Sequence, residues 1–161
     1  MVDNSEEYVV DDSAVSRWVT FEMDNESYGI SVSEVHEVLR FSEIAPVPGA
    51  PSFVIGIINL RGNVVTVIDT RSRFGLTPKE VDDKTRIIIN EIEGQQVGIL
   101  VDSVAEVVDI HSSDIEPAPN VGNEDTSRYI QGVTSLDGKL LIIIDLSKLL
   151  TDEELKDLSV F

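Results

Sequence analysis

The chain lacks cysteine, is poor in basic residues and has no long hydrophobic run, and each deficit excludes a class of protein. Without cysteine there is no disulfide, thiolate zinc site, iron–sulfur cluster or cysteine nucleophile. The longest apolar runs, such as 140–144, reach five residues, whereas a membrane-spanning helix needs about 20. The N-terminus is acidic where a secretory signal peptide would be basic and then apolar. These absences predict a cytoplasmic protein.

Acidic residues outnumber basic ones, with 30 Asp and Glu against 12 Lys and Arg, and the formal net charge is −18. This balance argues against nucleic acid and anionic membranes as partners, because both are contacted through Lys and Arg. One stretch, 54–73, is locally basic and contains a single acid, Asp69; its arginines are Arg61, Arg71 and Arg73. Three explanations remain open: acidity that only keeps the protein soluble, a basic island that orients a partner, and a host adapted to salt.

Two blocks of sequence recur in the same order in both halves of the chain. Residues 17–40 align without gaps onto 86–109, with eight of 24 positions identical, and 53–74 align onto 129–150. Most of the other paired positions exchange one apolar residue for another. The spacer between the blocks is longer in the second copy and rich in polar residues, proline and glycine. We therefore predict two copies of one module.

Each copy has the pattern of short β-strands, because Val, Ile and aromatic residues are concentrated between turn residues. The second block forms a hairpin around Asp137-Gly138, a strong tight-turn dipeptide in which both positions tolerate a positive φ. Gly62 is expected at the equivalent place in the first copy. The strands are apolar on both faces, which is typical of strands covered on both sides, as in a closed barrel. The prediction is an all-β fold with four or five strands per copy.

The two ends of the chain differ from the region 15–150 that holds both copies. Residues 1–14 carry five acids and no base, which predicts a flexible acidic tail. Thr151-Asp-Glu-Glu154 has the capping-box pattern and predicts a helix within 151–161.

No catalytic constellation is complete in the sequence. The glycine and lysine spacing around 132–140 does not fit a phosphate-binding loop. The two histidines, His36 and His111, lie in different copies without metal-ligand spacing. Asp69 and Asp145 end equivalent strands, and because they recur in both copies, capping of the following turn is favoured over a catalytic carboxylate pair. The sequence predicts neither an enzyme nor a cofactor or metal site.

Differences between the copies provide an internal control, since what the fold requires should be present in both. Arg61 corresponds to Asp137 at a hairpin tip, where turn chemistry favours Asp or Asn, so the turn does not need the arginine. Arg61 is therefore either a solvated surface charge or a residue used for binding. Three further pairs follow from the same comparison: His36 with Ala105, Arg40 with Asp109, and the identical pair Glu37 with Glu106.

The chain resembles the CheW family of bacterial chemotaxis coupling proteins in the string Phe53-Val-Ile-Gly-Ile-Ile-Asn-Leu-Arg-Gly-Asn-Val-Val-Thr-Val-Ile-Asp69, preceded by Tyr28-Gly-Ile and Val35-His-Glu-Val38. Two later strings match the same family, Val97-Gly-Ile-Leu-Val-Asp102 and Ile130-Gln-Gly-Val. The resemblance covers 17–150, nearly the whole chain, and N-L-R-G is specific in this setting.

The resemblance implies one CheW-like domain over 15–150, made of two pseudo-equivalent, intertwined five-stranded SH3-like barrels packed around a common apolar core, with a short C-terminal helix over 151–161. It implies a non-enzymatic adaptor that links the cytoplasmic tips of chemoreceptors to the CheA histidine kinase, in the cytoplasm at membrane-associated receptor arrays. Such an adaptor needs no cofactor, no direct membrane contact and no small-molecule substrate. With 161 residues there is no room for a fused receiver or kinase domain, so a stand-alone adaptor is expected.

In that family the receptor-binding surface includes the arginine of N-L-R-G and the glutamate of the upstream motif. The residues expected at the receptor surface of this chain are Val35, Glu37, Arg61 and Gly62. No kinase-binding residue is assigned. The alternative is a small-molecule-binding or enzymatic double β-barrel, which would need convergent polar groups in an apolar pocket.

Overall fold

The computed structural model describes residues 14–117 and 128–158. The predicted tail, 1–14, therefore lies outside the described residues except for its last position, and part of the polar spacer of the second copy lies outside them too. The described strands are β1 Val15–Met23, β2 Glu26–Ser31, β3 Val35–Arg40, β4 Val54–Leu60, β5 Asn63–Ile68, β6 Arg86–Ile92, β7 Gln95–Val101, β8 Ser103–His111, β9 Ile130–Leu136 and β10 Lys139–Ile144. The described helical segments are η2 Val32–Glu34, α2 Thr70–Arg73, η3 Ser112–Asp114, η4 Leu146–Lys148 and α4 Asp152–Leu158.

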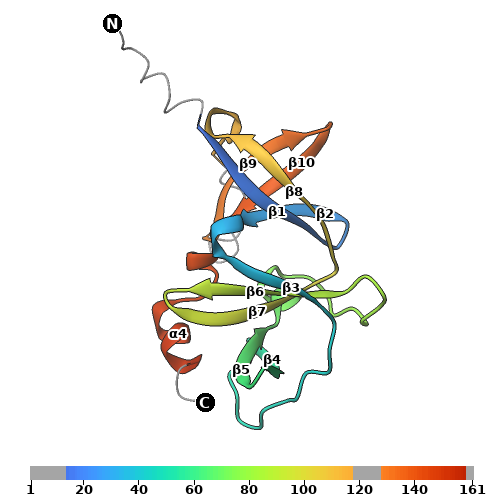
Figure 1. Cartoon of the computed structure of the whole chain (residues 1–161), viewed down its shortest axis with the longest axis vertical. Coiled ribbons are helices and arrows are strands. Elements are labelled where there is room, and N and C mark those ends of the chain that lie inside the picture. Colours follow the sequence, from blue (N-terminus) through green and yellow to red (C-terminus); the bar gives the residue numbers. More distant parts are fainter. Residues whose placement is uncertain (1–13, 118–127, 159–161) are drawn as a thin grey trace, which may run out of the picture.

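The strands form two five-stranded sheets with the same internal order. One sheet runs β8-β1-β2-β10-β9 and the other runs β3-β6-β7-β5-β4. The pairs β2–β10 and β5–β7 are parallel, and the other neighbours are antiparallel. In Figure 1 the first sheet occupies the upper half of the molecule and the second sheet the lower half.

Each sheet closes on itself through the segment that follows its first strand. After β3, Ala45 bridges to Ile57 of β4, and after β8, Glu116 bridges to Val133 of β9. We call the closed sheet β8-β1-β2-β10-β9 barrel 1 and the closed sheet β3-β6-β7-β5-β4 barrel 2. The expectation of two pseudo-equivalent five-stranded barrels is confirmed.

The two sequence copies exchange their first hairpins. Barrel 1 combines β1 and β2 from the first copy with β8, β9 and β10 from the second, and barrel 2 does the reverse. The offset of 69 residues converts β1–β2 into β6–β7, so each hairpin occupies its equivalent place in the opposite barrel. A sequence copy is therefore not a barrel, and neither half of the chain contains a complete one.

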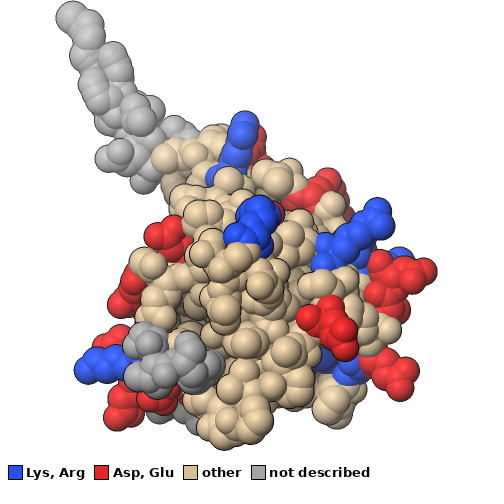
Figure 2. Space-filling model, turned by 60° about the horizontal axis from the view of Figure 1, so that its bottom comes forward, with Lys and Arg blue, Asp and Glu red and all other residues tan. Residues whose placement is uncertain are grey.

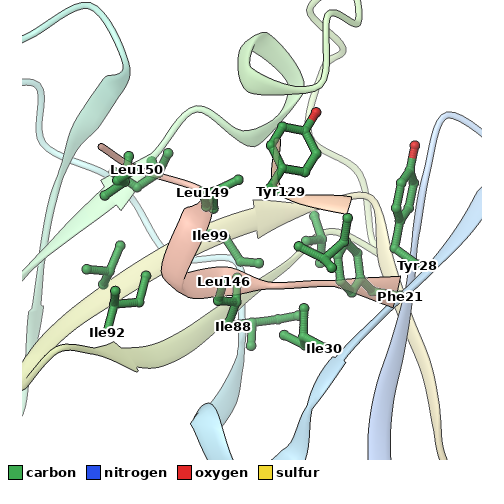
Figure 3. Packing of buried hydrophobic residues seen from close by; sticks show 14 of the residues in the cluster. Phe21, Tyr28, Ile30, Ile88, Ile92, Ile99, Tyr129, Leu146, Leu149 and Leu150 are labelled. Carbon is green, nitrogen blue, oxygen red and sulfur yellow. The ribbon is translucent and has the colours of Figure 1, made fainter. Parts of the chain in front are cut away.

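Three apolar clusters account for strands that are hydrophobic on both faces. Barrel 2 encloses one cluster that includes Ile87 and Ile89, and barrel 1 encloses one that includes Leu141 and Ile143. The largest cluster lies between the barrels and takes the opposite faces of the same strands, through residues such as Ile88. Figure 3 shows part of this common core, with Ile30, Ile88, Ile99 and Leu146 converging from different elements. The predicted covering of strands on both faces is confirmed.

The local turn and cap predictions are also confirmed. Gly62 and Gly138 occupy equivalent hairpin tips with φ of 89° and 80°. Asp69 and Asp145 cap the segments that follow them, because their Oδ1 atoms accept hydrogen bonds from the backbone of Ser72 at 3.1 Å and Ser147 at 3.0 Å. The recurrence of the two aspartates thus has a structural cause.

The C-terminal helix α4 follows β10 of barrel 1 in the chain but packs on barrel 2. It begins with the predicted capping box, in which Thr151 and Glu154 exchange backbone-to-side-chain hydrogen bonds of 2.9 and 3.1 Å. Glu154 also pairs with Arg73 at the end of α2, and Gln95 of β7 donates to the Leu155 carbonyl at 3.2 Å. These contacts hold the helix against barrel 2 (Figure 1).

Candidate functional site

The tip of the β4–β5 hairpin presents an arginine in a backbone conformation that arginine rarely adopts. Arg61 has φ of 50° and Gly62 has φ of 89°, and the Gly62 amide donates to Asn59 Oδ1 at 2.9 Å. Asp137, at the equivalent tip, has φ of 53°, so the two turns share one geometry. A positive φ is several-fold more common for Asp and Asn than for long side chains, and the turn therefore gains nothing from Arg61.

Glu37 of β3 holds the side chain of Arg61. Both terminal nitrogens of the guanidinium donate to the carboxylate, Nη2 to Oε2 and Nη1 to Oε1, the latter at 3.4 Å. The Arg61 side chain remains 68% exposed and that of Glu37 31% exposed. The hydrogen bond from Arg61 is the main reason that the pKa of Glu37 lies below its ordinary value. Two residues that the sequence places 24 positions apart thus form one exposed ion pair.

The other two predicted site residues, Gly62 and Val35, lie in the two elements that carry the pair. Gly62 follows Arg61 at the tip, where no heavy atom lies within 4 Å of the position a Cβ would take. Its requirement is therefore the positive φ and not a close contact. Val35 begins β3 and packs, half-buried, against the common core. Of the four predicted residues, the structure brings Glu37, Arg61 and Gly62 together and gives Val35 a packing role on the same strand.

A second polar pair lies on the same strand β3 as Glu37, and it was not among the predicted site residues. His36 Nε2 lies 2.8 Å from Glu91 Oε1 on the neighbouring strand β6. The same strand β3 exposes Val38 (40%), and β5 exposes Val64 (62%). The signal available from sequence was the difference between His36 and Ala105 in the two copies. This part of barrel 2 combines an ion pair, a His–Glu pair and exposed aliphatic side chains.

The three arginines of the basic stretch do not form a shared basic surface. Arg61 pairs with Glu37 and Arg73 pairs with Glu154, while Arg71 lies at the junction of the barrels. On the face drawn in Figure 2, most basic side chains likewise lie beside acidic ones. The hypothesis of a basic island that orients a partner is therefore not supported by the geometry of these arginines.

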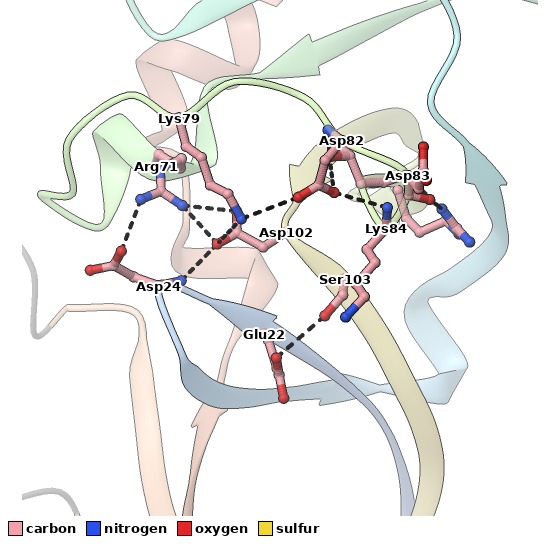
Figure 4. A network of polar contacts seen from close by, with 11 residues as sticks. Glu22, Asp24, Arg71, Lys79, Asp82, Asp83, Lys84, Asp102 and Ser103 are labelled. Atoms are coloured by element: carbon pink, nitrogen blue, oxygen red, sulfur yellow. Dashed lines mark hydrogen bonds and ion pairs between the residues drawn. The ribbon is translucent and has the colours of Figure 1, made fainter.

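Arg71 joins the two barrels through carboxylates. Its guanidinium donates to both oxygens of Asp102 at 2.8 and 2.7 Å, and to Asp24 at 3.1 Å (Figure 4). The side chains of Arg71 and Asp102 are only 12% and 14% exposed. Asp24 lies in the β1–β2 turn of barrel 1, and Asp102 lies between β7 and β8. This network fixes the orientation of the barrels and is a structural feature.

The described residues contain no group of three or more His, Asp or Glu that could hold a metal ion. His36 lies in β3 of barrel 2 and His111 at the end of β8 in barrel 1, so the two histidines belong to different barrels. No helix in the described part of the chain is long and apolar enough to cross a membrane.

The model of the CheW-like domain family matches residues 17–154. The chain belongs to the CheW family. Chemotaxis protein CheW of Bacillus subtilis (strain 168) is 36% identical over 137 residues, which cover 85% of this chain and 88% of that protein. Chemotaxis protein CheW of Klebsiella aerogenes is 33% identical over 138 residues, 86% of this chain and 83% of that protein.

A solved CheW structure has the same fold. The crystal structure of the scaffolding protein TtCheW from Thermoanaerobacter tengcongensis matches this CheW-family chain with a TM-score of 0.77 and 41% sequence identity, and the match covers 84% of this chain and 92% of that one. The family resemblance in the sequence is therefore confirmed over both barrels.

Proposed function

We propose that this CheW-family chain is a non-enzymatic chemotaxis adaptor that couples the cytoplasmic tips of chemoreceptors to a CheA-type histidine kinase. The observation that carries the proposal is the CheW-like domain match over 17–154. It is supported by relatives named chemotaxis protein CheW and by a similar structure described as a scaffolding protein. Neither the family nor these relatives support the alternative of a small-molecule-binding or enzymatic double barrel. The adaptor acts in the cytoplasm and is recruited to receptor arrays.

The receptor surface of this proposal is centred on Glu37 and Arg61. Arg61 is exposed, is not required by its turn, and is held in place by a carboxylate. A guanidinium has five N–H donors, so those that do not bind Glu37 are available to carboxylates or carbonyls of a partner. Because the fork is already oriented, binding orders few additional rotors, which lowers the entropic cost of association.

Val35 and Gly62 belong to this surface as positioning residues. Gly62 provides the second positive φ of the turn that presents Arg61, and Val35 anchors the start of β3 to the core. Both fix the separation between the hairpin tip and the strand that carries Glu37.

Reconstitution of receptor, kinase and this protein tests the proposal through Arg61→Glu. The substitution places two carboxylates side by side and removes the fork, and loss of one partner of a desolvated interfacial charge pair costs about 2–5 kcal/mol. Receptor affinity should therefore fall about 30-fold or more, and kinase stimulation should fall with it. The melting temperature should change little, because exposed substitutions usually alter stability by within about 0.5 kcal/mol.

Asp137→Lys is the matched control, since it reverses the charge of the equivalent tip in the other barrel. It should leave receptor binding unchanged. If Arg61→Glu couples receptor and kinase as well as the parent protein does, the assignment of Arg61 is wrong. If both variants lose receptor binding equally, the difference between the barrels has no bearing on the receptor.

A further inference from the structure

Barrel 1 has a groove of about 240 Å³ at the place equivalent to that of the Glu37–Arg61 pair in barrel 2. It is bounded by β1, β2, β8 and the β9–β10 hairpin. Its apolar part includes Leu141, which is 2% exposed, and Leu140, which is 54% exposed at the rim. Of the described residues that line it, the acidic ones are Glu22, Glu106 and Asp137, and the basic one is Lys139.

Glu106 occupies in barrel 1 the position that Glu37 occupies in barrel 2. In barrel 2 the Glu37 carboxylate binds the guanidinium of Arg61 at the hairpin tip. In barrel 1 the tip residue is Asp137, so a second carboxylate replaces the cation. Within residues 14–117 and 128–158, neither Glu106 nor Asp137 has an ion-pair partner. The groove keeps the anionic half of the pair and lacks the cationic half.

A second carboxylate of the groove, Glu22, also lacks the partner that its equivalent has in barrel 2. Glu22 occupies the position of Glu91, which pairs with His36 in barrel 2. The residue of barrel 1 equivalent to His36 is Ala105, which cannot carry a charge. Among the described residues, the Glu22 carboxylate accepts a side-chain hydrogen bond from Ser103 Oγ alone, at 3.5 Å (Figure 4), which is too long to be a strong one. In barrel 2 both carboxylates therefore have a nitrogen-bearing partner, a guanidinium for Glu37 and an imidazole for Glu91.

We infer that this groove is a second docking surface, which binds a segment of a partner protein that carries an arginine or lysine beside a leucine or valine. The basic side chain lies between Glu106 and Asp137, as Arg61 does against Glu37, and the aliphatic side chain covers Leu140. A volume of about 240 Å³ is below the roughly 300–1,000 Å³ of small-molecule pockets and suits individual side chains. A second copy of this chain is disfavoured as the occupant, because each copy carries a net charge of −18.

This surface goes beyond the proposed receptor contact, because it lies on the other barrel and does not use Arg61. An adaptor with one such surface on each barrel can hold two partners at once without competition between them. Binding in the groove of barrel 1 does not involve Arg61, so loss of receptor binding by Arg61→Glu would leave it unaffected.

Titration of the full, isotopically labelled chain with two short synthetic helical peptides tests the inference by NMR. One peptide carries an arginine one helical turn from two leucines, and the other has glutamate in place of the arginine. The arginine peptide should shift the amide signals of Glu106, Leu140 and their neighbours with a dissociation constant below about 1 mM, and salt should weaken it. The inference is overturned if both peptides shift these signals equally, if the shifts lie on barrel 2, or if none appear at about 1 mM.

Asp137→Arg rebuilds in barrel 1 the pair that barrel 2 already has. The turn should accept it, because Arg61 adopts φ of 50° where Asp137 has 53°. The new guanidinium should bind Glu106 and weaken the arginine peptide at least about tenfold, or about 1.4 kcal/mol. Asp157→Arg makes the same charge change at an exposed position of α4 and should have less than about a twofold effect. Equal weakening by both variants would show that only net charge matters and would overturn the site. If Asp137→Arg does not fold, Glu106→Gln must weaken the peptide instead.

Discussion

Replacement of Gly56 by alanine should open barrel 2 at its closure point. A Cβ at Gly56 would lie 2.2 Å from the Ala45 carbonyl oxygen and 2.8 Å from its carbon, distances that real Cβ atoms do not adopt. The neighbour is backbone, so it cannot move aside by a change of rotamer. Relief requires separation of the segment around Ala45 from β4, with loss of the two hydrogen bonds of 2.9 Å between Ala45 and Ile57.

The expected cost combines two effects. Overpacking of a well-packed site costs about 1–3 kcal/mol, and each lost hydrogen bond costs about 0.5–1.5 kcal/mol. Gly56→Ala should therefore destabilise the protein by about 2–6 kcal/mol, which lowers the melting temperature of a chain of this size by at least about 4 °C. Gly132→Ala should act in the same direction but less strongly, since its Cβ would lie 2.7 Å from the Glu116 carbonyl oxygen.

Gly29→Ala is the control, because its Cβ would lie 3.4 Å or more from the nearest atoms, all in side chains. Its melting temperature should stay within about 2 °C of the parent value. Thermal unfolding followed by circular dichroism ranks the three variants. If Gly56→Ala and Gly29→Ala have the same melting temperature, the carbonyl of Ala45 does not lie against Gly56, and the description of the barrel closure is wrong.

Three further measurements test buried polar groups. Burial raises the pKa of Glu154, but hydrogen bonds from Arg73 and the backbone outweigh burial and leave that pKa below its usual value. Glu154 should therefore stabilise the fold above about pH 4.5, and Glu154→Gln and the parent should converge in stability as the pH falls through the lowered pKa. Burial raises the pKa of Tyr129 to about 12, so its phenol should ionise late in an ultraviolet titration, with stability declining as the pH rises from about 10 to 12. Asn90 Oδ1 is buried without a hydrogen-bond partner in the described part of the chain, which costs about 1–3 kcal/mol. Asn90→Leu should raise the melting temperature, and a lower value would show that the bonds donated by Asn90 Nδ2 outweigh this cost.

Local features that depend on a few adjacent residues were predictable from the sequence. The tips at Gly62 and Gly138, the caps at Asp69 and Asp145 and the capping box of α4 all formed as expected. Each depends on backbone torsion angles and hydrogen bonds between near neighbours, which the chain cannot satisfy in many other ways. The family resemblance also rests on short strings of adjacent residues, and the match to the CheW-like domain over 17–154 confirmed it.

The pairing of site residues was not predictable, although the residues themselves were named. Glu37 and Arg61 were expected on one surface, but their ion pair depends on how the β4–β5 hairpin folds over β3. The partners of Arg71 and Arg73 are Asp102 and Glu154, which lie 31 and 81 residues away. Sequence spacing contains no information on such contacts, so a stretch that is basic in sequence folds into three arginines that each pair with carboxylates of other segments.

The sequence by itself determined that the chain is built from two copies of one β-module with the same strands, turns and caps, because those depend on local torsion angles and on the alternation of apolar residues. Only the tertiary structure decided that the copies exchange their first hairpins. The hairpins β1–β2 and β6–β7 occupy equivalent places and present the same apolar faces, so their pattern fits either barrel equally well. The choice depends on which neighbours the connecting segments let each hairpin reach and bury. The same long-range geometry decided that Glu37 and Arg61 meet in barrel 2, whereas the sequence itself places Asp137 opposite Glu106 in the groove of barrel 1.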